Sequence, residues 1–404
     1  MKILFINQVY PPDPAATGQQ QATLAQSLAQ QGHSVTVITS AHGYADPSIR
    51  FPAKETLHGV QIYRVPSTTL GKNAKWKRAI DFASYFLTAS LRALTLPRHD
   101  AIVTLTTPPL ISLLGVLLAR LWHSRFIYWV MDLNPDEAIA AGWLKPRSIY
   151  AHILETLSRL SFKNASAIIS LDRFMTQRIA HKGIAQHKIY TLPPWSFDAF
   201  LRYDPQGRSA FRRSHGIEDR FVIMYSGNHS PCHPLDPLLQ AALALRHNSH
   251  LLWCFIGGGS EYHKVLAFRE RHHLHHHILC LPYQPLHTLS ASLSAADLHC
   301  VVMGTPFVGI IHPCKIYNIL TLGIPTLCIA PTPSHLSELA DSTGDPHLLR
   351  VVAPHDLSAI VQAITEFQSL GTGRSDSRLR HLAAQFFQSA LIPRHIDVIL
   401  NQNS

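Results

Sequence analysis

The sequence predicts an α/β protein made of two doubly wound parallel sheets. The chain has 404 residues, two or three times the length of an ordinary domain. Short apolar runs of strand-forming residues alternate with helical patterns through both halves of the chain. Because these runs are apolar throughout, the strands are expected to be covered by helices on both faces, as in a parallel sheet.

In the first half, each expected strand is a short run rich in Ile, Val, Leu or aromatic residues, and each expected helix shows apolar residues three and four apart. The strands are expected at residues 2–7, 35–39, 60–65, 101–105, 126–130, 167–170 and 188–191. The helices are expected near residues 18–31, 78–96, 110–122, 147–163 and 173–181.

The second half repeats the same alternation. Its strands are expected at residues 221–226, 251–256, 278–281, 298–302, 325–329 and 348–352. Its helices are expected near residues 235–246, 260–273, 285–295, 314–322 and 355–370, and a last helix near 388–404 is expected to pack back on the first domain.

The alternation is interrupted at Pro193-Pro194 and over the polar stretch 202–220, so the linker between the domains is expected there. The predicted domains are residues 1–198 and 199–387. Open α/β sheets bind ligands beyond the carboxyl ends of their strands, so a cleft enzyme for a phosphorylated ligand or a nucleotide is expected.

The positive charge is concentrated in the first half. The whole chain has 35 Lys and Arg against 25 Asp and Glu, a net charge of +10. Residues 1–200 hold 20 basic and 11 acidic residues, whereas residues 201–404 hold 15 and 14. An anionic partner is therefore expected on the first domain.

Several other classes of protein are disfavoured. The longest apolar run, 110–119, ends at Arg120 and is too short to cross a bilayer. The N-terminus begins at once with a strand and shows no signal peptide, so a cytoplasmic location is expected. The six cysteines form no C-x-x-C pair, and Cys254, Cys300 and Cys328 lie in apolar runs, which favours buried reduced thiols.

A cluster of five histidines suggests a metal site at first sight. They are adjacent in sequence, lack the spacing of metal ligands and have no carboxylate partner, so a polar loop is the favoured interpretation and no metal site is predicted. These residues are His272, His273, His275, His276 and His277.

Two glycine-containing loops could approach a phosphate. The first lies between the first strand and the first helix and ends at Gly18, although an ordinary proline-rich loop is equally compatible with it. The second, Gly257-Gly258-Gly259, follows a strand and precedes a helix. It is not a G-x-G-x-x-G motif and has no suitable acid about 20 residues later, which disfavours a dehydrogenase.

The segment 308–325 is the most informative part of the sequence. Pro313 begins a predicted helix, Lys315 lies in its first turn, and Gly323 ends it. A cation there opposes the helix dipole, so its position is explained if it faces a diphosphate. A solvated surface lysine is the alternative.

Taken together, the motifs resemble family 4 glycosyltransferases. The segments that carry the resemblance are Tyr10–Asp13, Gly32-His33, Ser226–Asn228, Gly257–Gly259, Leu281–Tyr283, Ala296-Asp297 and residues 313–325. Within that family, residues 132–136 and 192–196 resemble the branch of bacterial O-antigen fucosamine transferases. The resemblance implies the GT-B fold, in which two Rossmann-like domains face each other across a cleft that holds a nucleotide-sugar.

The resemblance further implies metal-independent transfer with retention of configuration, no cofactor, and a UDP-sugar as the donor. The acceptor would be a lipid-linked sugar or glycan of a bacterial surface polysaccharide. With Gly18 from the first loop, the expected donor-binding residues are Asn228, His229, His233, Gly258, Tyr283, His312, Lys315, Tyr317 and Asn318.

Two departures from the family pattern stand out. The usual pair of glutamates falls on Ile310 and Asn318, and the usual cations fall near Asn228 and His233. Lys315 therefore remains the main cation for the diphosphate, helped by His229 or His233. If one of these histidines must be protonated, turnover is expected to fall as the pH rises through about 6 to 7.

Asp132 and Lys315 are the expected catalytic residues. Asp132 directly follows a predicted strand and is expected at the acceptor side of the cleft. The alternative is that Asp132 caps the following helix, with Asp136 and Glu137 in the first turn.

The acceptor side of the first domain is also expected to contact a membrane. Lys75, Trp76, Lys77 and Arg78 precede an apolar helical stretch, as in helices that lie on anionic lipid. A solvated basic rim on a core helix is the alternative. The protein is expected at the inner face of the cell membrane, with no nucleic-acid partner.

Two other functions remain open from the sequence. A nucleotide-sugar epimerase would need no acceptor, and a noncatalytic nucleotide-sugar binder would account for the two missing glutamates.

Overall fold

The computed structural model describes all residues except 14, 44–45, 72–74 and 402–404. The chain forms two compact units. The first unit consists of Met1–Pro194, Gly309–His312 and Leu391–Ser404, and the second of Trp195–Val308 and Pro313–Ala390. The chain passes between them after Pro194, four residues before the predicted boundary.

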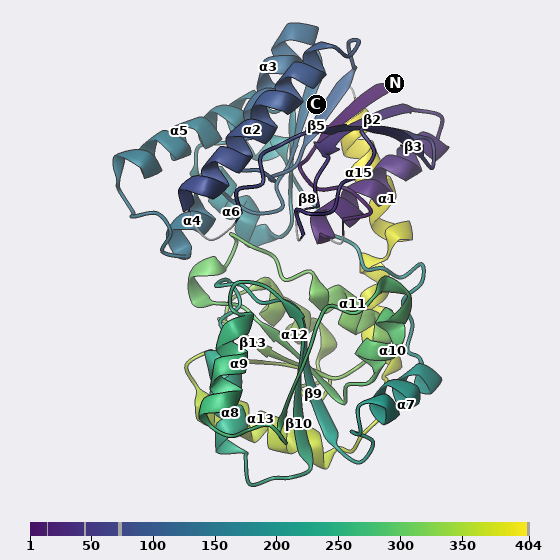
Figure 1. Cartoon of the computed structure of the whole chain (residues 1–404), viewed down its shortest axis with the longest axis vertical. Helices are drawn as coiled ribbons and strands as arrows, with labels where there is room; N and C mark the ends of the chain where they lie inside the picture. The colour runs from purple at the N-terminus through teal and green to yellow at the C-terminus, as the bar shows by residue number, and fades with distance from the viewer. Residues whose placement is uncertain (14, 44–45, 72–74, 402–404) are drawn as a thin grey trace. The chain divides into compact units, whose positions relative to one another are not determined.

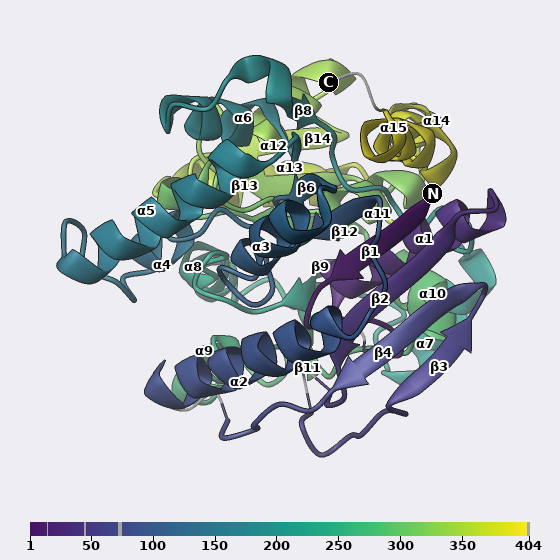
Figure 2. The same ribbon diagram turned by 90° about the horizontal axis from the view of Figure 1, so that it is seen from above.

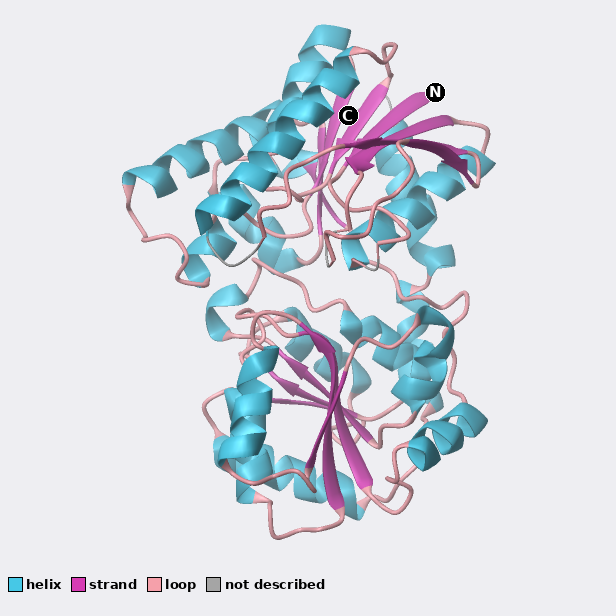
Figure 3. Ribbon diagram, in the orientation of Figure 1, coloured by secondary structure: helices cyan, strands magenta, loops and turns pink. Residues whose placement is uncertain are grey.

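The first unit contains an eight-stranded sheet in the order β3-β4-β2-β1-β5-β6-β7-β8 (Figure 1, Figure 3). Every pairing is parallel except β3 with β4, which is antiparallel. The strands are β1 (Lys2–Ile6), β2 (Ser34–Ser40), β3 (Lys54–Leu57), β4 (Val60–Val65), β5 (Ala101–Thr104), β6 (Arg125–Trp129), β7 (Ala167–Ser170) and β8 (Ile189–Thr191). The strand predictions for this half are confirmed, but β3 was missed because its sequence, KETL, lacks an apolar run.

Helices cover both faces of this sheet. They are α1 (Ala16–Gln30), α2 (Lys75–Leu94), α3 (Ser112–Trp122), α4 (Asp136–Ala140), α5 (Ile149–Asn164), α6 (Arg173–His181), the short η1 (Gln186–Lys188) and the last part of α15 (Gln388–Leu400). Right-handed crossovers place α2, α3 and α5 on one side of the sheet, and α3 contacts both of the others (Figure 2). On α15, the carbonyl of Ile399 accepts a hydrogen bond from Arg125 Nη1 at 2.8 Å.

The second unit contains a six-stranded, entirely parallel sheet in the order β11-β10-β9-β12-β13-β14. Its strands are β9 (Phe221–Asn228), β10 (Leu251–Gly258), β11 (Ile278–Leu281), β12 (Leu298–Val302), β13 (Thr326–Ile329) and β14 (Leu349–Val352). Its α-helices are α7 (Pro205–Ser214), α8 (Asp236–Ala244), α9 (Tyr262–Arg271), α10 (Leu289–Ser294), α11 (Lys315–Leu322), α12 (His335–Thr343), α13 (Leu357–Ser369) and α14 (Ser377–Ala383). Three short 3₁₀ turns complete it: η2 (Leu286–Thr288), η3 (Thr305–Phe307) and η4 (Ala384–Phe386).

Strand β9 shows why these runs are apolar throughout. Phe221, Ile223 and Tyr225 pack into the core on one face of the sheet. Val222 and Met224 pack into the core on the other face. Successive side chains of a strand point to opposite faces, so a strand with helices on both sides must be apolar at every position.

The prediction that residues 202–220 form a linker is wrong. Helix α7 occupies most of this stretch, and the Asp204 side chain caps it by accepting a hydrogen bond from Gly207 N. Arg208 and Arg212 pair with the buried carboxylate of Asp297 at 2.6 and 3.0 Å. The stretch is polar because its arginines neutralise a buried acid.

The remaining local predictions concern the cysteines, the histidine cluster and membrane spans. All six cysteines are free, and Cys254, Cys300 and Cys328 are buried as predicted. Burial raises the pKa of Cys254 to about 12, so its thiol stays protonated. The clustered histidines lie in turns between α9 and β11. Among the described residues, no helix is long and apolar enough to cross a membrane.

Candidate active site

The second unit brings two glycine loops together at the carboxyl ends of adjacent strands. Gly227 at the end of β9 pairs with Gly257 at the end of β10. Gly227, Gly257 and Gly259 have φ angles of 137°, 132° and 135°, which side chains rarely adopt. A Cβ on Gly257 would collide with the Gly227 carbonyl oxygen. The glycines therefore allow a close approach of two backbone loops where ligands of parallel sheets bind.

Lys315 reaches this glycine pair from the first position of α11. Its Nζ is buried 3.8 Å from the centre of the Tyr225 ring, and a Cβ on Gly227 would lie 2.9 Å from that nitrogen. Among the described residues, no hydrogen-bond acceptor contacts Nζ. Burial lowers the pKa of Lys315 to about 7, because the charged form has lost its water.

His229 and His233 lie close enough to Lys315 for its charge to affect both. Nδ1 of His229 donates to the Gly227 carbonyl at 3.0 Å, and Nδ1 of His233 donates to the Val302 carbonyl at 2.8 Å. Burial, and then the charge of Lys315, lowers the pKa of His229 to about 4 and that of His233 to about 3.

These pKa values disfavour the condition on which turnover was expected to fall between pH 6 and 7, namely a protonated His229 or His233. The pKa values of both imidazoles lie below that range, and among the described residues Nε2 of His229 has no hydrogen-bond partner. Of Lys315, His229 and His233, the lysine is the group whose pKa lies near 7.

Tyr283, Gly258 and Asn228 form the rim of the same loops. The Tyr283 hydroxyl donates to the Gly258 carbonyl at 3.0 Å, and the residue is 56% exposed. Asn228 is exposed, while its carbonyl accepts a hydrogen bond from the Tyr225 hydroxyl at 2.8 Å. These three predicted donor residues thus lie together with the glycine loops.

Tyr317 and Asn318 make structural contacts instead. The buried ring of Tyr317 lies 4.3 Å from that of Phe386, measured between centroids. Asn318 Oδ1 accepts a hydrogen bond from Phe197 N at 3.0 Å, so this atom is already engaged. At the other position where a family glutamate was expected, Ile310 is buried and its carbonyl accepts from Leu133 N at 2.8 Å.

Gly18 and His312 belong to the first unit. The N–H of Gly18 donates to the Ala15 carbonyl, and its missing Cβ leaves room for the backbone of Tyr10. Gly18 therefore serves helix packing and does not offer a free N–H to a phosphate.

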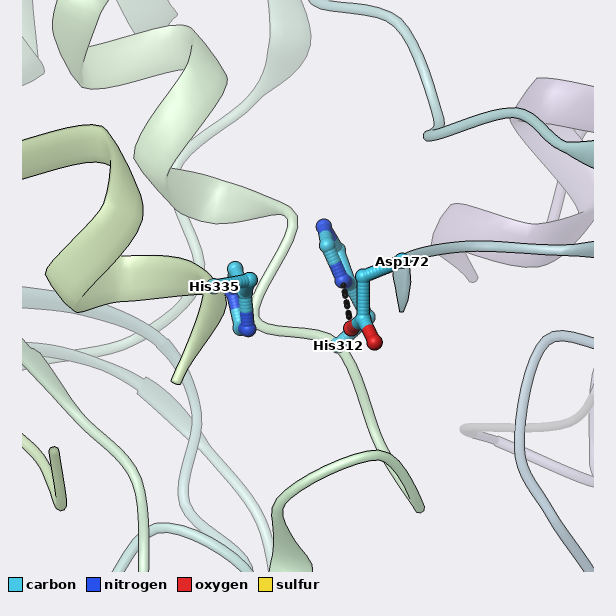
Figure 4. A group of neighbouring side chains, drawn as sticks. All are labelled: Asp172, His312 and His335. Carbon is cyan, nitrogen blue, oxygen red and sulfur yellow. Dashed lines mark hydrogen bonds and ion pairs between the residues drawn. The ribbon is translucent and has the colours of Figure 1, made fainter. Parts of the chain in front are cut away.

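His312 is held by Asp172, the residue that caps α6. Its Nδ1 lies 2.8 Å from Asp172 Oδ2, and both side chains are buried (Figure 4). Asp172 Oδ1 accepts a hydrogen bond from Met175 N. His335, also drawn in Figure 4, is the first residue of α12 in the second unit.

Asp132 lies in the first unit, three residues beyond the end of β6. Burial, and then the neighbouring charge of Glu137, raises the pKa of its carboxyl group well above the ordinary value. The alternative that Asp132 caps the next helix is wrong, because Pro135 is the N-cap residue of α4 and no side chain caps that end. A carboxyl with such a pKa is a candidate acid or base.

No motif in the sequence marks Tyr225 as a residue of the candidate site. Its ring lies under the Lys315 ammonium group. In the sequence, Tyr225 cannot be distinguished from the other apolar residues of β9. Its contact with Lys315 is visible only in the structure, where α11 places the lysine against the ring.

Comparisons with known proteins agree with this fold. Residues 16–195 match the family model described as "Glycosyl transferase 4-like domain". The chain is 25% identical over 381 residues to the putative colanic acid biosynthesis glycosyl transferase WcaI of Escherichia coli K12, covering 91% of this chain and 92% of the relative.

Solved structures show the same architecture. Anabaena HepE in complex with UDP and glucose superimposes with a TM-score of 0.73 at 14% identity, covering 98% of each chain. WaaG, a glycosyltransferase involved in lipopolysaccharide biosynthesis, gives a TM-score of 0.68 at 17% identity, covering 99% of this chain and all of WaaG.

The two Rossmann-like units and the matching domain define the class of protein: it is a glycosyltransferase with the GT-B fold. Residues 16–195 are the part of the chain that resembles the family 4-like glycosyltransferase domain.

Proposed function

We propose that this glycosyltransferase moves a sugar from a UDP-sugar to a lipid-linked acceptor during synthesis of a bacterial surface polysaccharide. Transfer proceeds without a metal and with retention of configuration. The observation that carries the proposal is the buried ammonium group of Lys315, which has no carboxylate partner in the described part of the chain and lies beside two glycine loops at the carboxyl ends of β9 and β10.

The surroundings of Lys315 fit a diphosphate. A buried cation is costly unless an anion pairs with it, and among the described residues no acid approaches its Nζ. A helix start and open glycine loops supply backbone N–H groups to phosphate oxygens. In transfer, the cation would stabilise the charge that develops on the leaving diphosphate.

Relatives support the choice of donor and pathway. HepE was solved with UDP and glucose, and WcaI and WaaG are named for colanic acid and lipopolysaccharide synthesis. The segments 132–136 and 192–196 further favour the branch of O-antigen fucosamine transferases.

The pH dependence of UDP binding tests the role of Lys315. We expect the affinity to fall as the pH rises above about 7, approaching tenfold per pH unit, because the free site loses the proton that the complex must keep. Isothermal titration calorimetry between pH 6 and 9 measures this fall. A Lys315→Met variant is the control, because it binds weakly and should show no such slope; the same slope in both proteins would contradict the proposal.

Transfer itself separates the proposal from a noncatalytic binder and an epimerase. We expect slow release of UDP from a UDP-sugar, accelerated when membrane extracts containing lipid-linked sugars are added. Release and sugar transfer are followed by chromatography. Donor that binds but is never consumed would favour the binder, and conversion of the donor to its epimer would favour the epimerase.

The first unit has a surface suited to the membrane that holds such an acceptor. Helix α2 exposes Trp76, Ile80, Leu87, Leu91 and Leu94, whose spacing places them on one side of the helix. Helices α3 and α5, on the same side of the sheet, add exposed apolar residues: Leu117 and Leu121, then Ile149, Tyr150, Ile153 and Leu160. We call these residues of α2, α3 and α5 the apolar face.

Positive charge coincides with the apolar face. Residues 75–98, 112–122 and 143–164 hold ten Lys and Arg against two acidic residues, whereas the rest of residues 1–200 holds ten against nine. Exposed apolar side chains flanked by cations fit the interface of an anionic bilayer, at about 1 kcal/mol per cation near the surface. The side chain of Lys75 lies outside the described part of the structure.

Liposome flotation tests this contact. We expect binding to vesicles of phosphatidylglycerol, and loss of that binding when Lys75, Lys77 and Arg78 are changed to Glu or when Leu87 and Leu91 are changed to Ser. The matched control changes Lys264, Arg269 and Arg271 of α9 to Glu, which alters the same charge on the second unit. Equal flotation of all four proteins, or none of the wild type, would contradict the membrane contact.

A further inference from the structure

The loop that follows β9 carries two histidines at the switch point of the second sheet. The chain continues from β9 to β10 on one side of this strand and later returns to β12 on its other side. Ligands of open α/β sheets bind in the crevice beyond such a point. His229 directly follows β9, and the ring of His233 contacts the carbonyl of Val302 at the end of β12. Both histidines therefore lie where the donor is proposed to bind.

Each imidazole is held in one tautomer by a backbone carbonyl. Nδ1 of His229 lies 3.0 Å from the Gly227 carbonyl oxygen, and Nδ1 of His233 lies 2.8 Å from that of Val302. A carbonyl oxygen only accepts hydrogen bonds, so Nδ1 must carry the proton in both rings. The pKa values of about 4 and about 3 indicate that neither ring binds a second proton at neutral pH. Nε2 of each ring is therefore a hydrogen-bond acceptor.

The acceptor on His229 lacks a donor in the described part of the chain. The residue is fully buried, and its ring packs edge-on against Tyr225 and Tyr262, with centroids 5.0 and 4.9 Å away, while Nε2 has no partner. Its N–H donates to the Gly258 carbonyl at 2.8 Å, and its carbonyl accepts from Glu261 N at 3.0 Å. The ring is thus fixed between the two glycine loops. Buried acceptors are normally satisfied, and a ligand hydroxyl would satisfy this one.

The donor site needs such acceptors. The Lys315 ammonium group and backbone N–H groups only donate hydrogen bonds, so they serve the diphosphate and leave the protons of neighbouring sugar hydroxyls without a partner. Asn318 Oδ1, which could have accepted them, is engaged with Phe197 N. His229 and His233 lie close enough to Lys315 for its charge to affect both, and His233 is partly exposed. Their Nε2 atoms are therefore acceptors beside the group proposed to bind the diphosphate.

We propose that His229 and His233, through their Nε2 atoms, accept hydrogen bonds from hydroxyl groups of the nucleotide-sugar next to the diphosphate. The ribose or the transferred sugar supplies these hydroxyls, which have the same chemistry. Lys315 then binds the charge of the donor, and the histidines bind its sugars. The inference rests on the proposed UDP-sugar donor. It differs from a role of the histidines as further cations, which would act on the phosphate oxygens.

Asparagine at either position tests the acceptor, because its Nδ2–H can replace Nδ1–H at the carbonyl while Nε2 is lost. If the hydroxyl belongs to ribose, we expect His229→Asn and His233→Asn to weaken UDP binding about fivefold and to leave 2′,3′-dideoxy-UDP binding unchanged. If it belongs to the transferred sugar, binding of UDP-glucose or UDP-N-acetylglucosamine should weaken about fivefold and that of UDP should not. Isothermal titration calorimetry at pH 6.5 measures these affinities.

The matched control is His250→Asn, at an exposed position just before β10 and at the opposite end of the strands. All its affinities should equal those of the wild type. Equal weakening of every ligand by the His229 and His233 variants, dideoxy-UDP included, would place the histidines on the diphosphate and overturn the proposal. Unchanged affinity for every ligand would also overturn it. A wild type that binds none of these nucleotides would instead contradict the proposed UDP donor.

NMR of the wild-type protein labelled with ¹⁵N-histidine tests the tautomers without any variant. Once the signals of His229 and His233 are assigned, long-range ¹H–¹⁵N spectra distinguish protonated from unprotonated ring nitrogens. We expect Nδ1 to be protonated and Nε2 unprotonated at pH 7 in the free protein, and the Nε2 signals to shift when UDP or a UDP-sugar binds. A proton on Nε2 of both rings would overturn the proposal whatever the binding data show.

Discussion

Replacing Lys315 by alanine is expected to weaken UDP binding at least about 100-fold and to reduce turnover by a similar or larger factor. Truncating one partner of a buried charge pair typically costs 2–5 kcal/mol of binding free energy. A cost of about 2.7 kcal/mol corresponds to a 100-fold weaker affinity. The group that this substitution removes is the Lys315 ammonium group, which lies beside the glycine loops. Calorimetry with UDP at pH 6.5, where Lys315 is mostly protonated, measures the effect.

Two further variants show whether the loss of UDP affinity is specific to the Lys315 ammonium group. Lys264→Ala removes an exposed lysine of the same unit, paired with Glu261, and should leave UDP affinity unchanged. Lys315→Met keeps most of the buried stem, and its melting temperature should equal or exceed that of the wild type, because an unpaired buried cation does not stabilise the fold. UDP affinity of Lys315→Ala within threefold of wild type would remove Lys315 from the donor site.

Replacing Asp132 by asparagine is expected to lower kcat at least about 100-fold while leaving UDP affinity unchanged. A general base contributes about 10²- to 10⁴-fold, and asparagine keeps the shape of the side chain without its basicity. UDP affinity should not change because Asp132 belongs to the first unit and Lys315 to the second. Initial rates at saturating donor, with calorimetry on the same samples, separate the two effects.

The stability of this variant reports independently on the environment of Asp132. Folding raises its pKa, so the protonated form is favoured and the wild type loses stability as the pH rises from the ordinary pKa of 3.8 through the raised one. Asparagine cannot ionise, so the melting temperature of Asp132→Asn should exceed that of wild type increasingly between pH 5 and 9. A difference in melting temperature that does not change with pH would show that the carboxyl group is not desolvated. A kcat of Asp132→Asn near that of the wild type would exclude a catalytic role for Asp132.

The local pattern of apolar residues was enough to predict the repeated strands and helices. Val35–Thr39 and Leu251–Ile256 are strands in the structure because their apolar side chains fill the cores on both faces of a sheet. The pattern failed where an element lacks such a run. Strand β3 is short and polar, and α7 is polar because Arg208 and Arg212 neutralise Asp297, which lies 85 or more residues later in the chain.

The same limit applies to the candidate site. The sequence placed Lys315 in the first turn of a helix and marked Gly257–Gly259 as a close-approach loop, since both signals are local. It could not show that Tyr225 lies under the ammonium group or that His229 and His233 are neutral. Burial, and distances between residues far apart in the chain, determine those properties.

The amino-acid pattern alone is sufficient to predict two doubly wound units, the concentration of positive charge in the first half, and the cation at the start of α11. Which polar residues are available for chemistry depends on the folded arrangement of the chain. Gly18 and Asn318 are engaged in packing and backbone contacts, whereas the buried Nζ of Lys315 has no hydrogen-bond partner among the described residues and desolvation raises the pKa of Asp132. The physical reason is desolvation, because the cost of burying a polar group depends on every neighbour that the fold brings to it.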